Sequence, residues 1–170
     1  RGTRELDADG RVVAPGIVDP HTHYDPQLTF EPYATSSCFH GVTTVLAGNC
    51  GFSVAPLRPG DADWLIQLFA RVEGMDATAL QGIPFEGFET FPEYLDSVER
   101  HGTVLNYTAY VGHTAVRLWV MGDDGYERVA TADELARMAD GVREAGGAGA
   151  AGVATTGAQT HKGVGGRRGR

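Results

Sequence analysis

The sequence predicts an α/β fold in which a parallel sheet alternates with helices. Short apolar, β-forming runs alternate along the chain with amphipathic helical patterns, and glycine or proline punctuates most of the boundaries. With 170 residues, 42% of them hydrophobic and 21% charged, the chain has enough apolar material for a core. If this sheet belongs to a closed barrel of eight βα units, which takes about 250 residues, the chain holds only about half of such a barrel and is incomplete at both ends.

Four segments have the composition of β-strands. Residues 10–21 contain apolar pairs on both sides of Pro15-Gly16, and we expect a strand that enters the core and breaks at this dipeptide. Residues 42–47 form an apolar, β-branched run between two glycines, which is typical of a strand buried on both faces. The third and fourth strands are expected within residues 103–113 and 150–157.

Three amphipathic segments separate these strands. Residues 61–74 are expected to form a crossover helix capped by Asp61 or Asp63, and residues 90–102 a helix capped by Thr90. Residues 131–149 begin with a capping box of Thr131 and Glu134. The apolar positions expected to face the core are Trp64, Leu65, Leu68, Phe69 and Val72 in the first helix, Tyr94, Leu95 and Val98 in the second, and Leu135, Met138 and Val142 in the third.

Charge and composition exclude several classes of protein. A formal net charge of −8 argues against a nucleic-acid or anionic-membrane partner, although the Gly/Arg-rich end is locally basic. No apolar run approaches the roughly 18 residues that span a bilayer, and the first residues lack a secretory signal, so a cytoplasmic protein is the default expectation. The two cysteines, Cys38 and Cys50, are too few for a disulfide scaffold.

Two histidines follow the first predicted strand. His21 and His23 are two residues apart, and alternate residues of a strand point to the same face. At the carboxyl end of a barrel strand, such a pair is suited to bind one divalent ion. A pair of surface histidines is the alternative interpretation.

Cys50 occupies the equivalent place after the second predicted strand. Neighbouring parallel strands lie about 4.8 Å apart, so a thiolate there can reach a metal ion held by the first strand. We therefore expect His21, His23 and Cys50 to form a metal site. A buried, structural cysteine is the alternative.

Several polar residues flank these candidate ligands or the end of the third strand. Asp25 and Asn49 are candidates for orienting the ligands, with capping or turn roles as the alternative. His113 is a candidate metal ligand, substrate contact or packing residue. Arg117 is a candidate for binding a substrate carboxylate, with a helix-surface charge as the alternative.

The motifs together resemble a known family. "PGIVDPHTHYD", "HGVTTVLAGNCGFSVAP", "VEGM", "FPEYLD" and "VGHTAVR" resemble the N-acyl-D-amino-acid deacylase (D-aminoacylase) group of the amidohydrolase superfamily, over residues 10 to 156. The "GNCGF" motif is the more specific of them. Related hydantoinases bridge two metal ions with a lysine on the fourth strand, whereas the only lysine of this chain, Lys162, lies beyond it.

The resemblance implies a zinc-dependent TIM-like hydrolase barrel, of which this chain would supply strands 1–4. It implies His21, His23 and Cys50 as ligands of one or two zinc ions, and an N-acyl amino acid as the small-molecule substrate. The family's remaining metal histidines and its catalytic aspartate would fall beyond Arg170. We therefore expect little or no deacylase activity from these residues alone.

The same resemblance implies three regions. Residues 1–10 are expected to be the remnant of a preceding β-sandwich, residues 11–157 the partial barrel, and residues 158–170 a Gly/Arg-rich tail. Two alternatives to an enzyme remain. One is an inactive metal-binding fragment that self-associates through the open edges of strands 1 and 4. The other is an unrelated doubly wound binding domain with incidental histidines.

Overall fold

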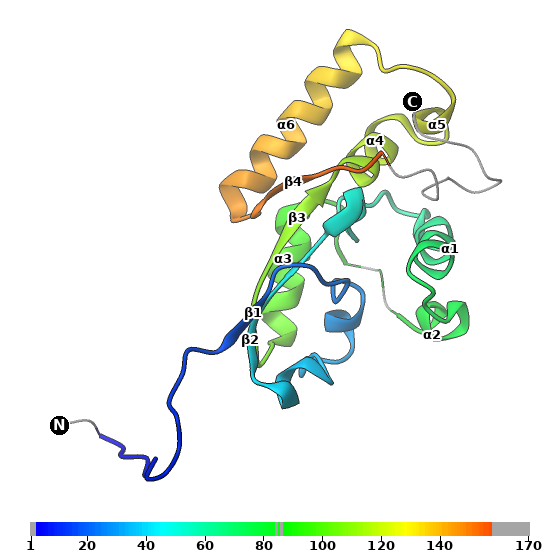
Figure 1. Ribbon diagram of the computed structural model, residues 1–170. Coiled ribbons are helices and arrows are strands. Elements are labelled where there is room, and N and C mark those ends of the chain that lie inside the picture. The colour runs from blue at the N-terminus through cyan, green and yellow to red at the C-terminus, as the bar shows by residue number, and fades with distance from the viewer. Residues whose placement is uncertain (1–2, 84, 86, 158–170) are drawn as a thin grey trace.

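Four parallel strands lie side by side in sequence order in the computed structural model, which describes residues 3–83, 85 and 87–157 (Figure 1). The strands are β1 (Ile17–Asp19), β2 (Val42–Ala47), β3 (Asn106–Gly112) and β4 (Gly152–Ala154). This arrangement confirms the predicted parallel α/β fold. The strand order β1-β2-β3-β4 never reverses, whereas a doubly wound sheet reverses at its binding crevice, which disfavours that alternative.

Helices and short helical turns connect the strands. The helices are α1 (Ala62–Val72), α2 (Ala77–Gln81), α3 (Phe91–His101), α4 (His113–Met121), α5 (Asp124–Glu127) and α6 (Ala132–Ala148). The 3-10 turns are η1 (Gln27–Thr29), η2 (Ser37–His40) and η3 (Asn49–Gly51). In Figure 1, α1 and α2 lie apart from α6, with the strands between them.

Capping side chains define the starts of α3 and α6. Thr90 accepts a hydrogen bond from the backbone N–H of Glu93, whose carboxylate accepts one from the N–H of Thr90. Thr131 and Glu134 make the same exchange at α6, as predicted. Asp61 precedes α1 without capping it, because its carboxylate accepts a hydrogen bond from Nε of Arg58 at 2.8 Å.

The long connection between β2 and β3 contains two long helices, α1 and α3, which pack on different parts of the molecule. Helix α3 packs on the sheet, where the hydroxyls of Tyr94 and Tyr107 lie 2.6 Å apart. Helix α1, predicted as a crossover helix, packs elsewhere. The ring of Phe69 lies 6.3 Å from that of His23, and the ring of Trp64 lies 6.0 Å from that of Tyr126 in α5. Helix α1 is therefore placed beside the histidines of the β1 loop.

Three expectations about the core are wrong in detail. Val12 and Val13 are 93% and 83% exposed, because the strand begins only at Ile17 and the residues just before it are exposed. In β2, Val45 and Ala47 are buried while the residues between and before them are not, so the strand is not buried on both faces. Leu135 is 54% exposed, whereas Met138, which was predicted on the same face of α6, is buried together with Ala145.

Two further expectations concern the ends of the chain and membranes. The predicted Gly/Arg-rich tail, residues 158–170 with His161, lies outside the described residues. Among the helices of the described ranges, none combines the length and the apolar character that crossing a membrane requires.

Glu134 is expected to make the stability of the α6 end pH-dependent. The hydrogen bond from Arg128, followed by that from the backbone of Thr131, lowers the pKa of Glu134 from 4.5 to about 2. Because the folded-state pKa is the lower one, its stabilisation is complete above about pH 4.5 and is lost as the pH falls toward 2. We expect the difference in free energy of unfolding between the parent and Glu134→Gln to shrink across this window. Urea denaturation at several pH values measures it, and a pH-independent difference would contradict the expectation.

Candidate metal centre

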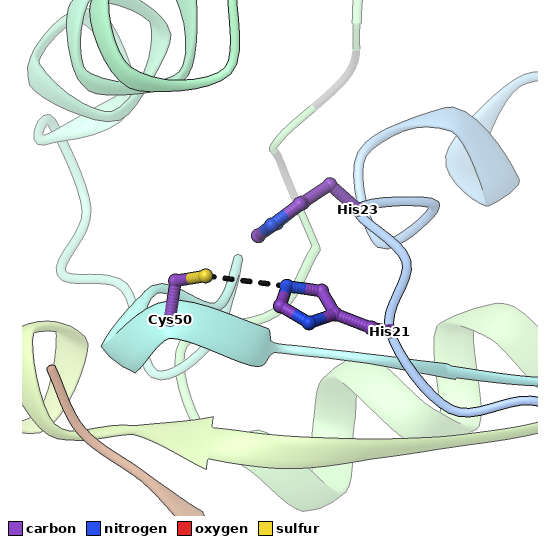
Figure 2. A group of neighbouring side chains, drawn as sticks. All are labelled: His21, His23 and Cys50. Carbon is purple, nitrogen blue, oxygen red and sulfur yellow. Dashed lines mark hydrogen bonds between the residues drawn. The ribbon is translucent and has the colours of Figure 1, made fainter.

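Three side chains from two loops converge at the carboxyl end of the sheet. The donor atoms of His21, His23 and Cys50 all lie within 4.8 Å of one another. Nε2 of His21 lies 3.2 Å from Sγ of Cys50, and the two imidazole rings have centroids 5.8 Å apart. Figure 2 shows both histidines reaching from the β1 loop toward the cysteine of η3. The structure thus brings together the three residues that the sequence indicates.

The two histidines are held by the residue between them. Strand β1 ends at Asp19, so the His-Thr-His segment lies beyond the strand. Thr22 nevertheless continues the pairing with β2, since its backbone N–H and its hydroxyl both donate to the carbonyl of Leu46, at 2.9 and 2.8 Å. Because Thr22 faces β2, the side chains of His21 and His23 turn the other way, toward Cys50.

The sequence suggested that Cys50 lies at the end of the second strand, but the structure places it beyond that strand. Strand β2 ends at Ala47, and Cys50 lies within the tight turn η3 with φ 56°. This left-handed conformation is uncommon for a residue other than glycine, and residues held in such sparsely populated conformations cluster at functional sites. Gly48 begins the turn with φ 71°, and a Cβ atom there would lie 2.0 Å from the carbonyl oxygen of Tyr110. The turn therefore lies directly against β3.

Asn49 ties the two ligand-bearing loops together. Its side chain is buried, and Nδ2 donates to the carbonyl oxygens of Thr22 at 3.2 Å and of Leu46 at 3.1 Å. One amide thus bridges the residue between the two histidines and the end of β2. This contact gives Asn49 a positioning role in the geometry of the site.

Asp25 makes a second link between the same two loops. Its side chain is fully buried, and Oδ2 accepts a hydrogen bond from the backbone N–H of Val54 at 3.0 Å. Its own carbonyl oxygen accepts one from the hydroxyl of Tyr94 at 3.2 Å. Burial raises the pKa of Asp25 to about 7, against the opposing effect of the hydrogen bonds. Asp25 therefore connects the histidine loop, the segment after Cys50 and helix α3.

Glu73 is a neighbour of the site that the sequence analysis did not select. Its Oε2 lies 3.3 Å from Nε2 of His23. Burial, and then the charge of Glu73, raise the pKa of the Cys50 thiol. An acidic residue at the end of a helix has no sequence pattern that marks it as part of a metal site. The "VEGM" motif that contains Glu73 contributed only to the family resemblance.

His113 and Arg117 lie outside this group of three. His113 is the exposed first residue of α4, and its Nδ1 lies 3.3 Å from Oγ1 of Thr155. Although the residue is exposed overall, partial desolvation of its ring, followed by the charge of Arg117, lowers the pKa of His113. Arg117 is not a surface charge: it is buried and donates to the carbonyl oxygens of Gly125 and Arg128. Its guanidinium thus braces α4 against α5.

The three donors fit a zinc ion by their chemistry. Imidazole nitrogen and cysteine thiolate are preferred zinc ligands, with bonds of about 2.0 to 2.3 Å. Two donors of one tetrahedral ion with such bonds lie roughly 3.3 to 3.8 Å apart, and the His21–Cys50 separation of 3.2 Å is close to this range. Small side-chain adjustments would therefore bring the group to coordinating distance.

Comparison with known proteins places the chain in context. Residues 4–163 match the model of the Amidohydrolase family. The chain is 38% identical over 150 residues to a D-aminoacylase of Alcaligenes xylosoxydans xylosoxydans, covering 88% of this chain and 28% of that protein. An N-acyl-D-aspartate deacylase of the same organism is 36% identical over 154 residues, covering 91% of this chain and 28% of that protein.

Solved structures agree with these matches. N-acyl-D-glutamate deacylase from Bordetella bronchiseptica, complexed with zinc and a phosphonate inhibitor, superposes with a TM-score of 0.70 at 35% identity, over 88% of this chain and 28% of that one. A D-aminoacylase crystal structure gives a TM-score of 0.65 at 36% identity, over 83% of this chain and 27% of that one. These matches confirm the predicted partial hydrolase barrel. The chain spans about a quarter of the length of these proteins.

Proposed function

The chain belongs to the amidohydrolase family, and from that premise we propose that it supplies His21, His23 and Cys50 to the metal centre of an enzyme that deacylates N-acyl-D-amino acids. The observation that carries this proposal is the convergence of the three donor atoms within 4.8 Å. The relatives named as D-aminoacylase and N-acyl-D-aspartate deacylase support the substrate class.

The residues of the site have distinct roles in this proposal. His21 and His23 bind through neutral imidazole nitrogens, and Cys50 binds as a thiolate after releasing its proton. One or two zinc ions held there would supply Lewis acidity, which activates water and polarises the amide carbonyl. Asn49 and Asp25 keep the two loops in register, so that the donors stay preorganised.

The complete reaction needs further groups. A general base must take a proton from the attacking water, and a general acid must protonate the leaving amine. The family resemblance assigns both tasks to an aspartate outside this chain. It also implies two further histidines, outside this chain, as metal ligands. We therefore propose that deacylase activity belongs to a longer polypeptide.

The function is tested on the full natural polypeptide. We expect zinc-dependent hydrolysis of an N-acetyl-D-amino acid, with the L enantiomer as the matched control. Replacing His21 by alanine is expected to lower kcat/KM by about 100-fold or more, because loss of outer-shell partners alone costs about 10 to 100-fold. Hydrolysis that persists after chelation of the metal, or in His21→Ala, would contradict the proposal.

A specific observation also favours the second candidate, a self-associating chain. The edge strands carry exposed apolar residues, since Ile17 and Val18 of β1 are 55% and 56% exposed and Val153 of β4 is 53% exposed. Exposed apolar edge strands promote pairing between chains. Sedimentation velocity distinguishes the candidates: a discrete dimer of the 170-residue chain would support self-association, and a monomer would contradict it.

A further inference from the structure

The end of β3 lies directly against the turn that carries Cys50. A Cβ atom on Gly112, the last residue of β3, would lie 2.6 Å from the carbonyl oxygen of Gly51 and 2.7 Å from the backbone nitrogen of Ser53. The backbone N–H of Gly112 also donates to Oγ of Ser53 at 3.0 Å. Gly51 is the residue after Cys50. His113, the residue after Gly112, therefore lies at the rim of the candidate metal centre.

The segment after β4 meets the same turn and orients His113. A Cβ atom on Gly51 would lie 3.3 Å from Cα of Thr155, the residue that follows β4. Oγ1 of Thr155 lies 3.3 Å from Nδ1 of His113, which is within hydrogen-bonding distance. Both residues are exposed, and Nε2 of His113 has no hydrogen-bond partner within residues 3–83, 85 and 87–157. The hydroxyl thus holds one ring nitrogen, and the other is available to a ligand.

His113 is the first residue of α4, and this position favours the neutral imidazole. The amino end of a helix carries a partial positive charge, which disfavours an imidazolium ion. Partial desolvation of the ring, followed by the charge of Arg117, lowers the pKa of His113 from its ordinary value. When Nδ1 accepts the hydroxyl proton of Thr155, a neutral histidine carries its own proton on Nε2. Nε2 is then a hydrogen-bond donor.

The spacing of the strand ends is comparable with the size of the substrate. Cys50 lies beyond β2 and His113 directly after β3, and these neighbouring parallel strands are about 4.8 Å apart. In an N-acyl amino acid, ordinary bond lengths place the carboxylate oxygens about 4 to 5 Å from the acyl carbonyl carbon. A carboxylate only accepts hydrogen bonds, so a donor at the end of β3 suits it.

We propose that His113 is a substrate-contact residue, whose Nε2–H donates a hydrogen bond to the carboxylate of the N-acyl-D-amino acid. This inference rests on the proposed function, because it takes its substrate from there. Thr155 is a positioning residue, since it acts on the substrate only through the imidazole. The pair makes the site prefer a substrate with a free carboxylate over its uncharged carboxamide, because hydrogen bonds to charged groups are the stronger ones.

Steady-state kinetics of the full natural polypeptide with zinc test this contact. His113→Leu keeps roughly the size of the side chain and removes the donor. We expect kcat/KM for the N-acetyl-D-amino acid to fall by about 10 to 100-fold, and that for its carboxamide by less than about tenfold. Bound zinc should stay unchanged, because His113 is not a ligand in this proposal. His113→Gln, whose amide N–H can still donate, should recover part of the loss.

Thr155 and His40 provide the companion variants. Thr155→Val removes the hydroxyl and should lower kcat/KM for the acid by about 2 to 10-fold, whereas Thr155→Ser should keep the parental value. His40→Leu is the matched control, since His40 is an exposed histidine before β2, at the amino end of the sheet, and its loss should change neither substrate's kcat/KM. Circular dichroism checks folding. Should His113→Leu not fold, equal values for Thr155→Val and Thr155→Ser would overturn the proposal.

The outcomes separate this inference from the proposed function. If the parent hydrolyses the acid and His113→Leu matches it, or loses acid and carboxamide activity equally, His113 does not contact the carboxylate. Loss of zinc from His113→Leu would make the residue part of the metal centre and also overturn the proposal. Should the parent not hydrolyse the carboxamide, His113→Gln decides, and activity no better than that of His113→Leu counts against the contact. A parent without zinc-dependent hydrolysis would show instead that the proposed function is wrong.

Discussion

Cys50→Ser is expected to lower the affinity of the chain for zinc by about 100-fold or more. Serine has nearly the shape of cysteine, but its hydroxyl does not ionise near neutral pH, whereas a coordinating thiol is deprotonated and binds as an anion. The remaining imidazoles of His21 and His23 would then hold the ion without the thiolate. Competition with a chromophoric chelator measures the affinity directly.

Cys38→Ser is the matched control for this substitution. Cys38 is the other free cysteine, it is half-buried like Cys50, and it lies outside the group of converging donors. Its replacement should leave zinc affinity unchanged. Equal affinities for Cys50→Ser and the parent would exclude Cys50 as a ligand, while an equal loss in both variants would indicate a general effect of removing a thiol.

Gly48→Ala is expected to destabilise the fold by about 2 to 5 kcal/mol. Two effects add at this position. The left-handed conformation, φ 71°, costs roughly 1 to 2 kcal/mol for a residue with a Cβ atom. The new Cβ atom would also lie 2.0 Å from the carbonyl oxygen of Tyr110, and overpacking of this kind costs about 1 to 3 kcal/mol. Urea denaturation followed by circular dichroism measures the change.

Two other glycines separate these effects. Gly41 has φ 83°, and a Cβ atom added there would meet no described atom within 4 Å, so Gly41→Ala should show the conformational cost alone. A Cβ atom on Gly112 would lie 2.6 Å from the carbonyl oxygen of Gly51 without a left-handed φ, so Gly112→Ala should show the steric cost alone. A loss for Gly48→Ala no larger than that for Gly41→Ala would contradict the close contact between η3 and β3.

The sequence predicted the elements whose signals are local. The capping boxes at Thr90 and Thr131 identify the starts of α3 and α6 because the interacting groups lie within three residues of each other. Strand β2 was predicted with its observed ends, since glycines bound its β-branched run. The grouping of His21, His23 and Cys50 followed from a rule of parallel sheets, namely that carboxyl ends of neighbouring strands share one edge.

The features that the sequence could not predict depend on contacts between distant segments. Glu73 lies beside His23 only because Phe69 docks α1 on the histidine loop. Arg117 is buried because carbonyl groups of the following turn accept its hydrogen bonds, and no spacing rule distinguishes it from a surface arginine. The exposure of Val12 and Val13 depends equally on which elements are available to cover them.

The packing of Trp64 on Tyr126 gives the chain a built-in optical reporter. Trp64 lies on α1, the helix that carries Glu73 at its end, and the only other tryptophan, Trp119, lies on α4. In a Trp119→Phe background, intrinsic tryptophan fluorescence would therefore come from α1 alone. Stopped-flow mixing with zinc could then follow, in real time, whether this helix shifts against α5 as the ion enters.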